Sequence, residues 1–248
     1  MRNPINMLSS LQNHSSDKSY TFERLYRNLY NRELFLLAYQ NIYASQGNMT
    51  KGTDGKTIDA MSLNRIDGII ASLKDESYQP QPSRRTYIPK KNGKMRPLGI
   101  PSFDDKLVQE CVRLLLEAAY EGSFAKTSHG FRPNHSCHTA LSQAQVCFTG
   151  VKWFVEGDIK GFFDNINHEV MIGILAEHIK DERFLRLIRK FLKAGYLEDW
   201  QYHNTYSGTP QGGIISPILA NIYLDKLDRY MEELKKRFDK GAVRAVYP

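Results

Sequence analysis

The stretch KWFVEGDIKGFFDNI, residues 152–166, carries the pattern that decides the fold. An apolar run reaches a single acid, Asp158, which is followed by Lys160, a glycine and two adjacent phenylalanines. We interpret residues 152–158 as a buried strand that ends in this carboxylate. Such burial is costly unless a cation or a partner holds the acid ionised. Because Mg²⁺ binds one or two carboxylates together with substrate phosphates, the pattern indicates a magnesium site. The alternative is a structural acid paired with Lys160 or with a helix N-terminus.

Length and composition set the class of protein. The chain has 248 residues, enough for one large or two small domains. Its 41% hydrophobic and 25% charged residues are ordinary for a soluble globular protein. No apolar run reaches the roughly 20 residues of a membrane span, and the first residues contain no apolar signal core. We therefore expect a soluble, cytoplasmic protein with no membrane partner.

The positive charge is concentrated in one place. Net charge is +7, and residues 84–96 carry six Lys or Arg and no acid. Residues 1–56 are weakly basic, with seven bases and four acids. A focused positive patch favours a phosphate-bearing partner, and a solvated lysine-rich loop is the alternative.

Hydrophobic periodicity predicts mainly helices, joined by a few strands. Asn31 is the expected cap between two helices in residues 21–45, and Ser136 and Ser216 are expected to cap two later helices. The strong amphipathic helix that follows residue 102 should bury Leu107, Val108, Cys111, Val112, Leu115 and Ala119. Further helices are expected at 167–179 and 181–194, so the fold class is α/β or α+β.

The basic stretch reads as a β-hairpin. Strand-like segments surround KKNGK, and Asn-Gly between such segments is a strong hairpin signal. Lys90 and Arg96 flank the turn, where they would hold a triphosphate. The loop GTPQGG, residues 208–213, places Gln211 beside the cleft, and its glycines allow close backbone approach. Phe163, five residues after Asp158, is either a ring close to the metal or ordinary core.

Four blocks carry a family resemblance: RRTYIPKKNGKMRPLGIPSFDDKLVQ, SHGFRPNHSCHTAL, FVEGDIKGFFDNI and GTPQGGIISPILANIYLDKLD. In this order they resemble successive blocks of the reverse transcriptases encoded by bacterial group II introns, also called maturases. The resemblance implies a helix-rich α+β right-hand polymerase fold with fingers and a partial palm. It divides the chain into an N-terminal extension and start of the fingers, fingers with the basic hairpin, and a palm, at residues 1–83, 84–150 and 151–248.

The resemblance also implies roles for single residues. Asp158 resembles the first catalytic aspartate, and the Ile159 carbonyl resembles the metal ligand beside it, with Mg²⁺ as cofactor. Lys90 and Arg96 resemble the residues that hold the incoming triphosphate. Phe163 resembles the ring that blocks a ribose 2′-hydroxyl.

Further implied roles concern nucleotide and RNA. Gln211 resembles the glutamine that lines the nucleotide pocket. The expected RNA-binding residues are basic and lie on the hairpin or in the loop near 44–58: Arg84, Arg85, Lys91, Lys94, Lys51 and Lys56. The implied partners are group II intron RNA, an RNA template with its DNA primer and deoxynucleoside triphosphates. A homodimer is a further expectation, because an incomplete palm would expose apolar surface.

The sequence departs from the family in one respect. The second acidic block, usually Tyr-Ala-Asp-Asp, is absent from the 248 residues. We therefore expect an N-terminal part of a longer protein, which alone would bind RNA without polymerising, since two-metal chemistry needs opposing carboxylates. The competing functions are an RNA-directed DNA polymerase and an RNA-binding splicing cofactor, which one family member can combine. A retron or defence reverse transcriptase is the third reading, and the block SHGFRPNHSCHTAL disfavours it.

Weaker constellations have structural explanations. His135, Cys137 and His138 lack the second ligand pair of a zinc site. Asp164 lies near Asp158 in sequence, but a direct metal role for it is not favoured. Asp104 and its neighbour begin a helix, whose dipole they would stabilise.

Overall fold

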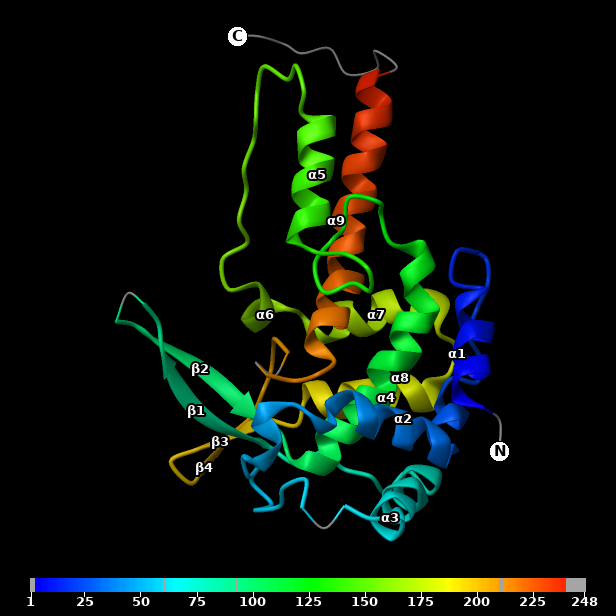
Figure 1. Ribbon diagram of the computed structural model, residues 1–248, viewed down its shortest axis with the longest axis vertical. Coiled ribbons are helices and arrows are strands. Elements are labelled where there is room, and N and C mark those ends of the chain that lie inside the picture. Colours follow the sequence, from blue (N-terminus) through cyan, green and yellow to red (C-terminus); the bar gives the residue numbers. More distant parts are fainter. Residues whose placement is uncertain (1–2, 60, 92, 210–211, 240–248) are drawn as a thin grey trace.

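The computed structural model describes residues 3–59, 61–91, 93–209 and 212–239. A body of packed helices carries a small sheet on one side, and α5 extends from the body at the same end as the last turns of α9 (Figure 1). The helices of the first half are α1 Pro4–Gln12, η1 Tyr26–Tyr30, α2 Arg32–Tyr43, η2 Gln46–Met49, α3 Leu63–Lys74, α4 Phe103–Tyr120 and η3 Glu121–Ser123. Those of the second half are α5 Cys137–Cys147, α6 Phe162–Asn165, α7 His168–His178, α8 Glu182–Leu192 and α9 Ser216–Asp239.

The sheet has four strands in the order β2-β1-β3-β4. The predicted basic hairpin is confirmed as β1 Ser83–Pro89 paired antiparallel with β2 Met95–Ile100. Asn92 of its turn lies outside the described residues. The other half of the sheet is a short hairpin that the sequence did not predict. It consists of β3 Tyr196–Glu198, which runs parallel to β1, and β4 Gln201–His203.

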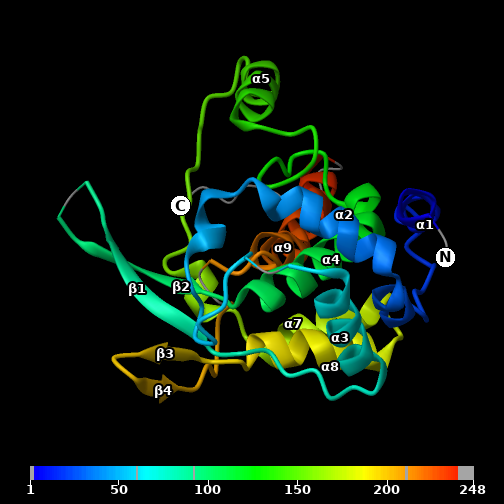
Figure 2. The ribbon, with the colours of Figure 1, turned by 60° about the horizontal axis from the view of Figure 1, so that its bottom comes forward.

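Helix α4 is the centre of the core. It lies between α2 on one side and α7 and α8 on the other (Figure 2). The six positions predicted to face the core are all buried, with Leu107, Val108, Cys111, Val112 and Leu115 at 0% exposure. This apolar contact stabilises the body, because each fully buried side chain contributes about 1.5–3 kcal/mol relative to an exposed one.

Two of the predicted helix caps, Asn31 and Ser136, are confirmed, whereas Ser216 is the first residue of α9. The Asn31 side chain accepts a hydrogen bond from Glu33 N, and Ser136 forms a capping box with Thr139. Ser102 caps α4 and also donates to the Asp105 carboxylate at 2.7 Å. Burial raises the pKa of the Asp105 carboxyl above its ordinary value, although its hydrogen bonds oppose that shift.

The apolar spacing of α9 predicts an inward face made of Ile218, Ile222, Leu227, Met231 and Leu234. Ile218 and Ile222 are buried, whereas Leu227 and Met231 are about half exposed, at 49% and 52%. The helix leaves the body before these positions, so the described residues place no layer over them (Figure 1). Among the helices of the described residues, none combines the length and the apolar character needed to cross a lipid bilayer.

Candidate functional site

The segment around Asp158 does not adopt the structure that the sequence predicts for it. Residues 152–158 form no strand, and Trp153 and Val155 are 87% and 93% exposed. The segment runs from α5 to α6 as an extended connection at the edge of the molecule (Figure 1). The prediction of a buried strand is therefore wrong. A strand needs a neighbour to pair its backbone groups, and within the described part of the chain the sheet lies elsewhere.

The metal ligands predicted here are exposed. Asp158 and Ile159 both lie on the surface, Ile159 at 51% exposure. The described residues contain no group of three or more His, Cys, Asp or Glu side chains able to hold a metal ion. An oxygen donor of this kind suits Mg²⁺. One carboxylate does not fix a metal pair, however, so the described donors fit Mg²⁺ in type but not in number.

The hairpin separates its basic residues onto two faces. Ile88 pairs with Arg96, and residues opposite each other in an antiparallel pair share a face. Lys90 lies two positions after Ile88, and its N–H donates to Lys94 O at 2.7 Å, so Lys90, Lys94 and Arg96 share one face. Arg85 points to the opposite face. The two residues predicted to hold a triphosphate are therefore neighbours.

The positive charges of Lys90, Lys91 and Arg96 are not neutralised within the hairpin. Lys90 and Arg96 are exposed, and so is Lys91 in the turn. Among the described residues, no carboxylate lies within ion-pair range of these three side chains. The hairpin therefore presents positive charge to solvent, which favours a phosphate-bearing ligand.

The other predicted RNA-binding residues lie close to the base of the hairpin or in the adjacent loop. Arg84 Nε donates to Lys51 O at 3.0 Å, which fastens the loop of residues 45–62 to β1. Lys51 and Lys56 are exposed on that loop. Arg85 instead stacks on Tyr196, with its guanidinium carbon 3.5 Å from the ring centroid. The structure thus places Arg84 and Lys51 side by side and directs Arg85 elsewhere.

Helix α6 and the glycine-rich loop are joined by backbone hydrogen bonds. Thr209 N donates to Phe163 O at 2.8 Å, and Gly208 N donates to Ile166 O at 2.7 Å. Gly208 has a φ of +84°, and a Cβ there would lie 2.6 Å from Phe163 O, so glycine is required. Phe163 itself is half-buried, with its ring edge-on to Phe162. The loop therefore begins beside the backbone of Phe163, the predicted sugar-selecting residue.

The same loop continues onto the hairpin. Gly212 has a φ of +99°, and a Cβ there would lie 2.3 Å from Gly99 O of β2. The Gln109 side chain of α4 then accepts a hydrogen bond from Ile214 N at 2.9 Å and fixes the start of α9. Gln211 lies outside the described residues. These contacts bring the hairpin, α6 and the glycine-rich loop together, although they are distant in sequence.

Two positioning residues were not found from the sequence. His168 of α7 is buried, and its Nε2 lies 2.7 Å from Gly208 O, so it anchors the glycine-rich loop to α7. Gln109 is only 3% exposed, among the buried apolar side chains of α4. A polar residue within an apolar stripe is the signal that identifies both, because buried polar groups are almost always hydrogen-bonded.

The weaker candidates have structural roles or no ligand geometry. Asp104 pairs with Arg65 at 2.7 Å and Asp164 is exposed on α6. Cys137 is exposed at the start of α5, in a region where the described residues offer no metal-binding cluster. A hollow of about 1270 Å³ lies between α1, η1 and Lys74, away from the predicted site.

Comparison with protein families gives a match to reverse transcriptase (RNA-dependent DNA polymerase) over residues 88–244. The chain is 57% identical over 228 residues to group II intron-encoded protein LtrA of Lactococcus lactis subsp. cremoris, covering 92% of this chain and 38% of LtrA. It is 49% identical to an uncharacterized 91 kDa protein in cob intron of Schizosaccharomyces pombe, covering 98% of this chain and 30% of that protein. The predicted resemblance is confirmed, and the chain spans less than two fifths of the length of either relative.

Solved structures support the fold. The chain superimposes on a partial Cas6-RT-Cas1–Cas2 complex with a TM-score of 0.55 and 22% sequence identity, covering 87% of this chain and 36% of the other. At this identity the likeness concerns the fold alone. The mixed sheet with its surrounding helices agrees with the fingers and palm arrangement predicted from the sequence.

Proposed function

The chain belongs to the reverse transcriptase family, and on that premise we propose that it forms the nucleotide-binding part of an RNA-directed DNA polymerase. The observation that carries the proposal is the convergence of the hairpin, α6 and the glycine-rich loop through the Thr209–Phe163 hydrogen bond and the Gly212–Gly99 contact. These segments contain four of the residues expected around an incoming nucleotide: Lys90, Arg96, Phe163 and Gln211.

Each residue has one task in the proposed reaction. Lys90 and Arg96 bind the triphosphate of the incoming deoxynucleotide through charge-assisted hydrogen bonds. Phe163 excludes a ribose 2′-hydroxyl by its bulk, and Gln211 lines the pocket. Asp158 and the Ile159 carbonyl are the proposed Mg²⁺ ligands of this part of the chain. When bound, Mg²⁺ neutralises charge on the reacting phosphate oxygens.

The RNA partner binds through the basic surface in this proposal. Basic side chains on the hairpin and the adjacent loop would neutralise phosphates and release counterions, which makes affinity fall with salt. The proposed ligands are template RNA with its DNA primer and group II intron RNA, whose splicing the protein would assist; the similarity to a group II intron-encoded protein supports this choice. The contributing residues are Arg84, Arg85, Lys91, Lys94, Lys51 and Lys56.

The proposal extends to organisation and location. We assign residues 1–83 to the N-terminal extension and start of the fingers, 84–150 to the fingers and 151–248 to the palm. The protein acts in the cytoplasm, and exposed apolar side chains such as Trp153 and Val155 favour association into a homodimer.

Primer extension tests the proposed function. Asp158→Asn in the full protein removes a charge but almost no volume, so DNA synthesis on a primed RNA template should fall by about 100-fold or more. The matched control is Glu156→Gln, an equally exposed acid two residues earlier. Near-wild-type extension by the Asp158→Asn variant would remove Asp158 from the site.

A further inference from the structure

A cavity of about 410 Å³ lies beside the base of the hairpin, on the face opposite Lys90 and Arg96. Its volume is typical of small-ligand pockets, which span roughly 300–1,000 Å³. β1, β3, α6 and the loop before α9 all contribute to the wall, through residues that include Arg85, Tyr196, Asp164, Asn204, Tyr206 and Thr209. None of these residues belongs to the proposed nucleotide site, and only Arg85 belongs to the proposed RNA-binding set.

Two polar groups of the wall are buried without a partner. Arg85 Nε and Thr209 Oγ1 make no hydrogen bond among the described residues, and Thr209 is only 4% exposed. Folded proteins leave few buried polar groups unsatisfied, because each one loses its hydration without compensation. Both residues line one cavity, so a ligand with hydrogen-bond acceptors that enters it would satisfy these donors once their side chains turn toward it.

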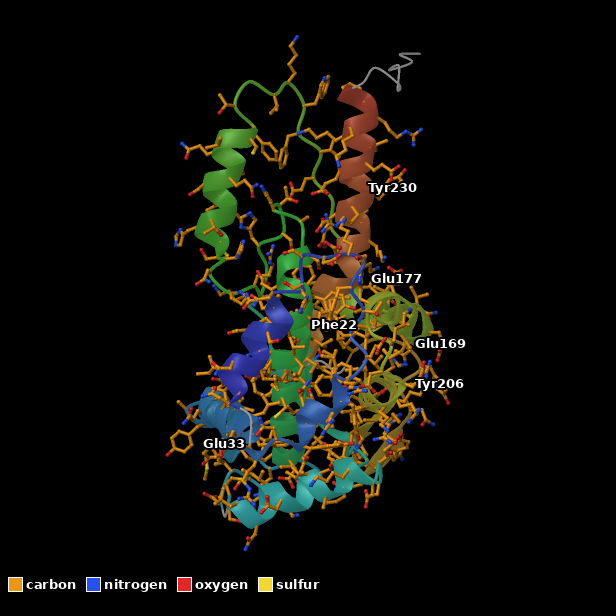
Figure 3. All side chains as sticks on the ribbon, turned by 90° about the vertical axis from the view of Figure 1, so that its right-hand side faces the viewer. Phe22, Glu33, Glu169, Glu177, Tyr206 and Tyr230 are labelled. Atoms are coloured by element: carbon orange, nitrogen blue, oxygen red, sulfur yellow. The ribbon has the colours of Figure 1, made fainter. Side chains whose placement is uncertain are left out.

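The wall also offers one open flat side chain. The ring of Tyr196 is covered, because Arg85 of β1 lies 3.5 Å over its centroid and His203 of β4 stacks on it at 4.9 Å with an interplanar angle of 14°. Tyr206, which is labelled in Figure 3, also lines the cavity and has 85% of its surface exposed. Planar side chains beside unsatisfied donors suit a heteroaromatic ring, which stacks on aromatic faces and accepts hydrogen bonds in its own plane.

Charge decides which part of a nucleotide enters the cavity. The Asp164 carboxylate belongs to the wall and disfavours a phosphate inside. The exposed bases of the adjacent hairpin attract phosphates outside the cavity. A base and its sugar therefore match the interior, while the phosphates remain near the hairpin.

We propose that this cavity binds one nucleoside unit, whose base accepts hydrogen bonds from Arg85 and Thr209 and stacks on Tyr206. The inference rests on the proposed function, which brings nucleic acid to the hairpin. The unit comes from a nucleic-acid strand or from a free nucleotide, and both sources share this chemistry.

Photocrosslinking tests the proposal directly. An RNA octamer with one 5-iodouridine should give adducts on Tyr206 or Tyr196 that mass spectrometry can map, and Tyr206→Ala should lower their total yield about tenfold, since stacking supplies much of the affinity per base. Trp200→Ala is the control, because Trp200 is 94% exposed on the neighbouring turn and does not line the cavity. Adducts from 5-iodouridine monophosphate instead of the octamer would identify a free nucleotide as the source. Absence of adducts on both tyrosines with both probes, or an equal loss in the control, would overturn the proposal.

Thr209→Val provides the second measurement. It removes the unsatisfied hydroxyl at nearly constant volume, so the melting temperature should stay the same or rise, while affinity for the crosslinking probe falls about threefold or more. A lower melting temperature with unchanged affinity would show that the hydroxyl is structural. Primer extension by the unaltered protein separates the two claims, because extension without tyrosine adducts contradicts only the cavity. Adducts without extension contradict only the polymerase.

Discussion

Helix α8 and residues 151–159 have similar apolar sequences but opposite environments. In α8, Phe184 and Ile188 are at 0% exposure, and the other apolar positions of the helix are buried as well. In the second segment, Trp153 and Val155 are almost fully exposed. Apolar content alone therefore does not determine burial in this molecule.

Backbone hydrogen bonding explains the difference. A helix pairs its own N–H and C=O groups, so α8 needs only one apolar surface against which to pack. A strand also needs a neighbouring strand, which the described residues do not place beside residues 152–158. The comparison teaches that the sequence pattern of a strand predicts burial only where its pairing partner is also known.

The largest expected effect is on the free energy of unfolding, and it tests the comparison between α8 and residues 151–159. Phe184→Ala should lower the free energy of unfolding by about 3–5 kcal/mol, because it leaves a cavity in the core. Val155→Ala, at a side chain that is 93% exposed, should change it by less than about 0.5 kcal/mol. Urea titration followed by circular dichroism measures both. A loss at Val155 comparable to that at Phe184 would mean that the segment is buried in solution.

A smaller effect is expected on nucleotide affinity. It concerns the basic hairpin, which contacts the glycine-rich loop, in contrast to the exposed segment around Asp158. Lys90→Ala and Arg96→Ala should each raise the apparent KM for deoxynucleotides by about 10- to 100-fold, the equivalent of one lost charge-assisted hydrogen bond. RNA affinity should change less. Steady-state primer extension by the full protein gives the KM, and Lys235→Ala on the exposed end of α9 is the control. Loss of RNA binding with an unchanged KM would make the hairpin a template clamp instead.

The smallest effect refines the role of α6. Phe163→Val should raise incorporation of ribonucleotides relative to deoxynucleotides by about tenfold, because a smaller side chain leaves room for a 2′-hydroxyl. Phe131→Val, at a ring that is 73% exposed, should leave the ratio as it is. Single-nucleotide incorporation with both sugar types measures it. An unchanged ratio of ribonucleotide to deoxynucleotide incorporation in the Phe163 variant would show that this ring only packs in the core.

Local sequence patterns were sufficient to predict most elements of the helical body and the basic hairpin. The apolar face of α4, the caps at Asn31 and Ser136 and the basic hairpin were all predictable, because each depends on neighbours within a few residues. The family resemblance also followed from the sequence, since its four blocks occur in order.

Contacts between segments that are distant in sequence could not be predicted from local sequence patterns. The three-residue strands β3 and β4 are too short to show alternation, and β3 pairs in parallel with β1 more than 100 residues earlier. The His168 contact with Gly208 likewise depends on how α7 meets a loop 40 residues away. Asp158 was misplaced for the same reason, because a strand was assigned without its partner.

Hydrogen exchange tests the central claim that the hairpin, α6 and the glycine-rich loop form one nucleotide site. The full protein would be measured alone, with a primed RNA template, and with the template plus a complementary nucleotide that cannot be incorporated. Adding the nucleotide should slow exchange together in residues 84–96, 162–165 and 207–213, with no comparable change in α5. Protection confined to the hairpin, or equal protection without the nucleotide, would contradict the account.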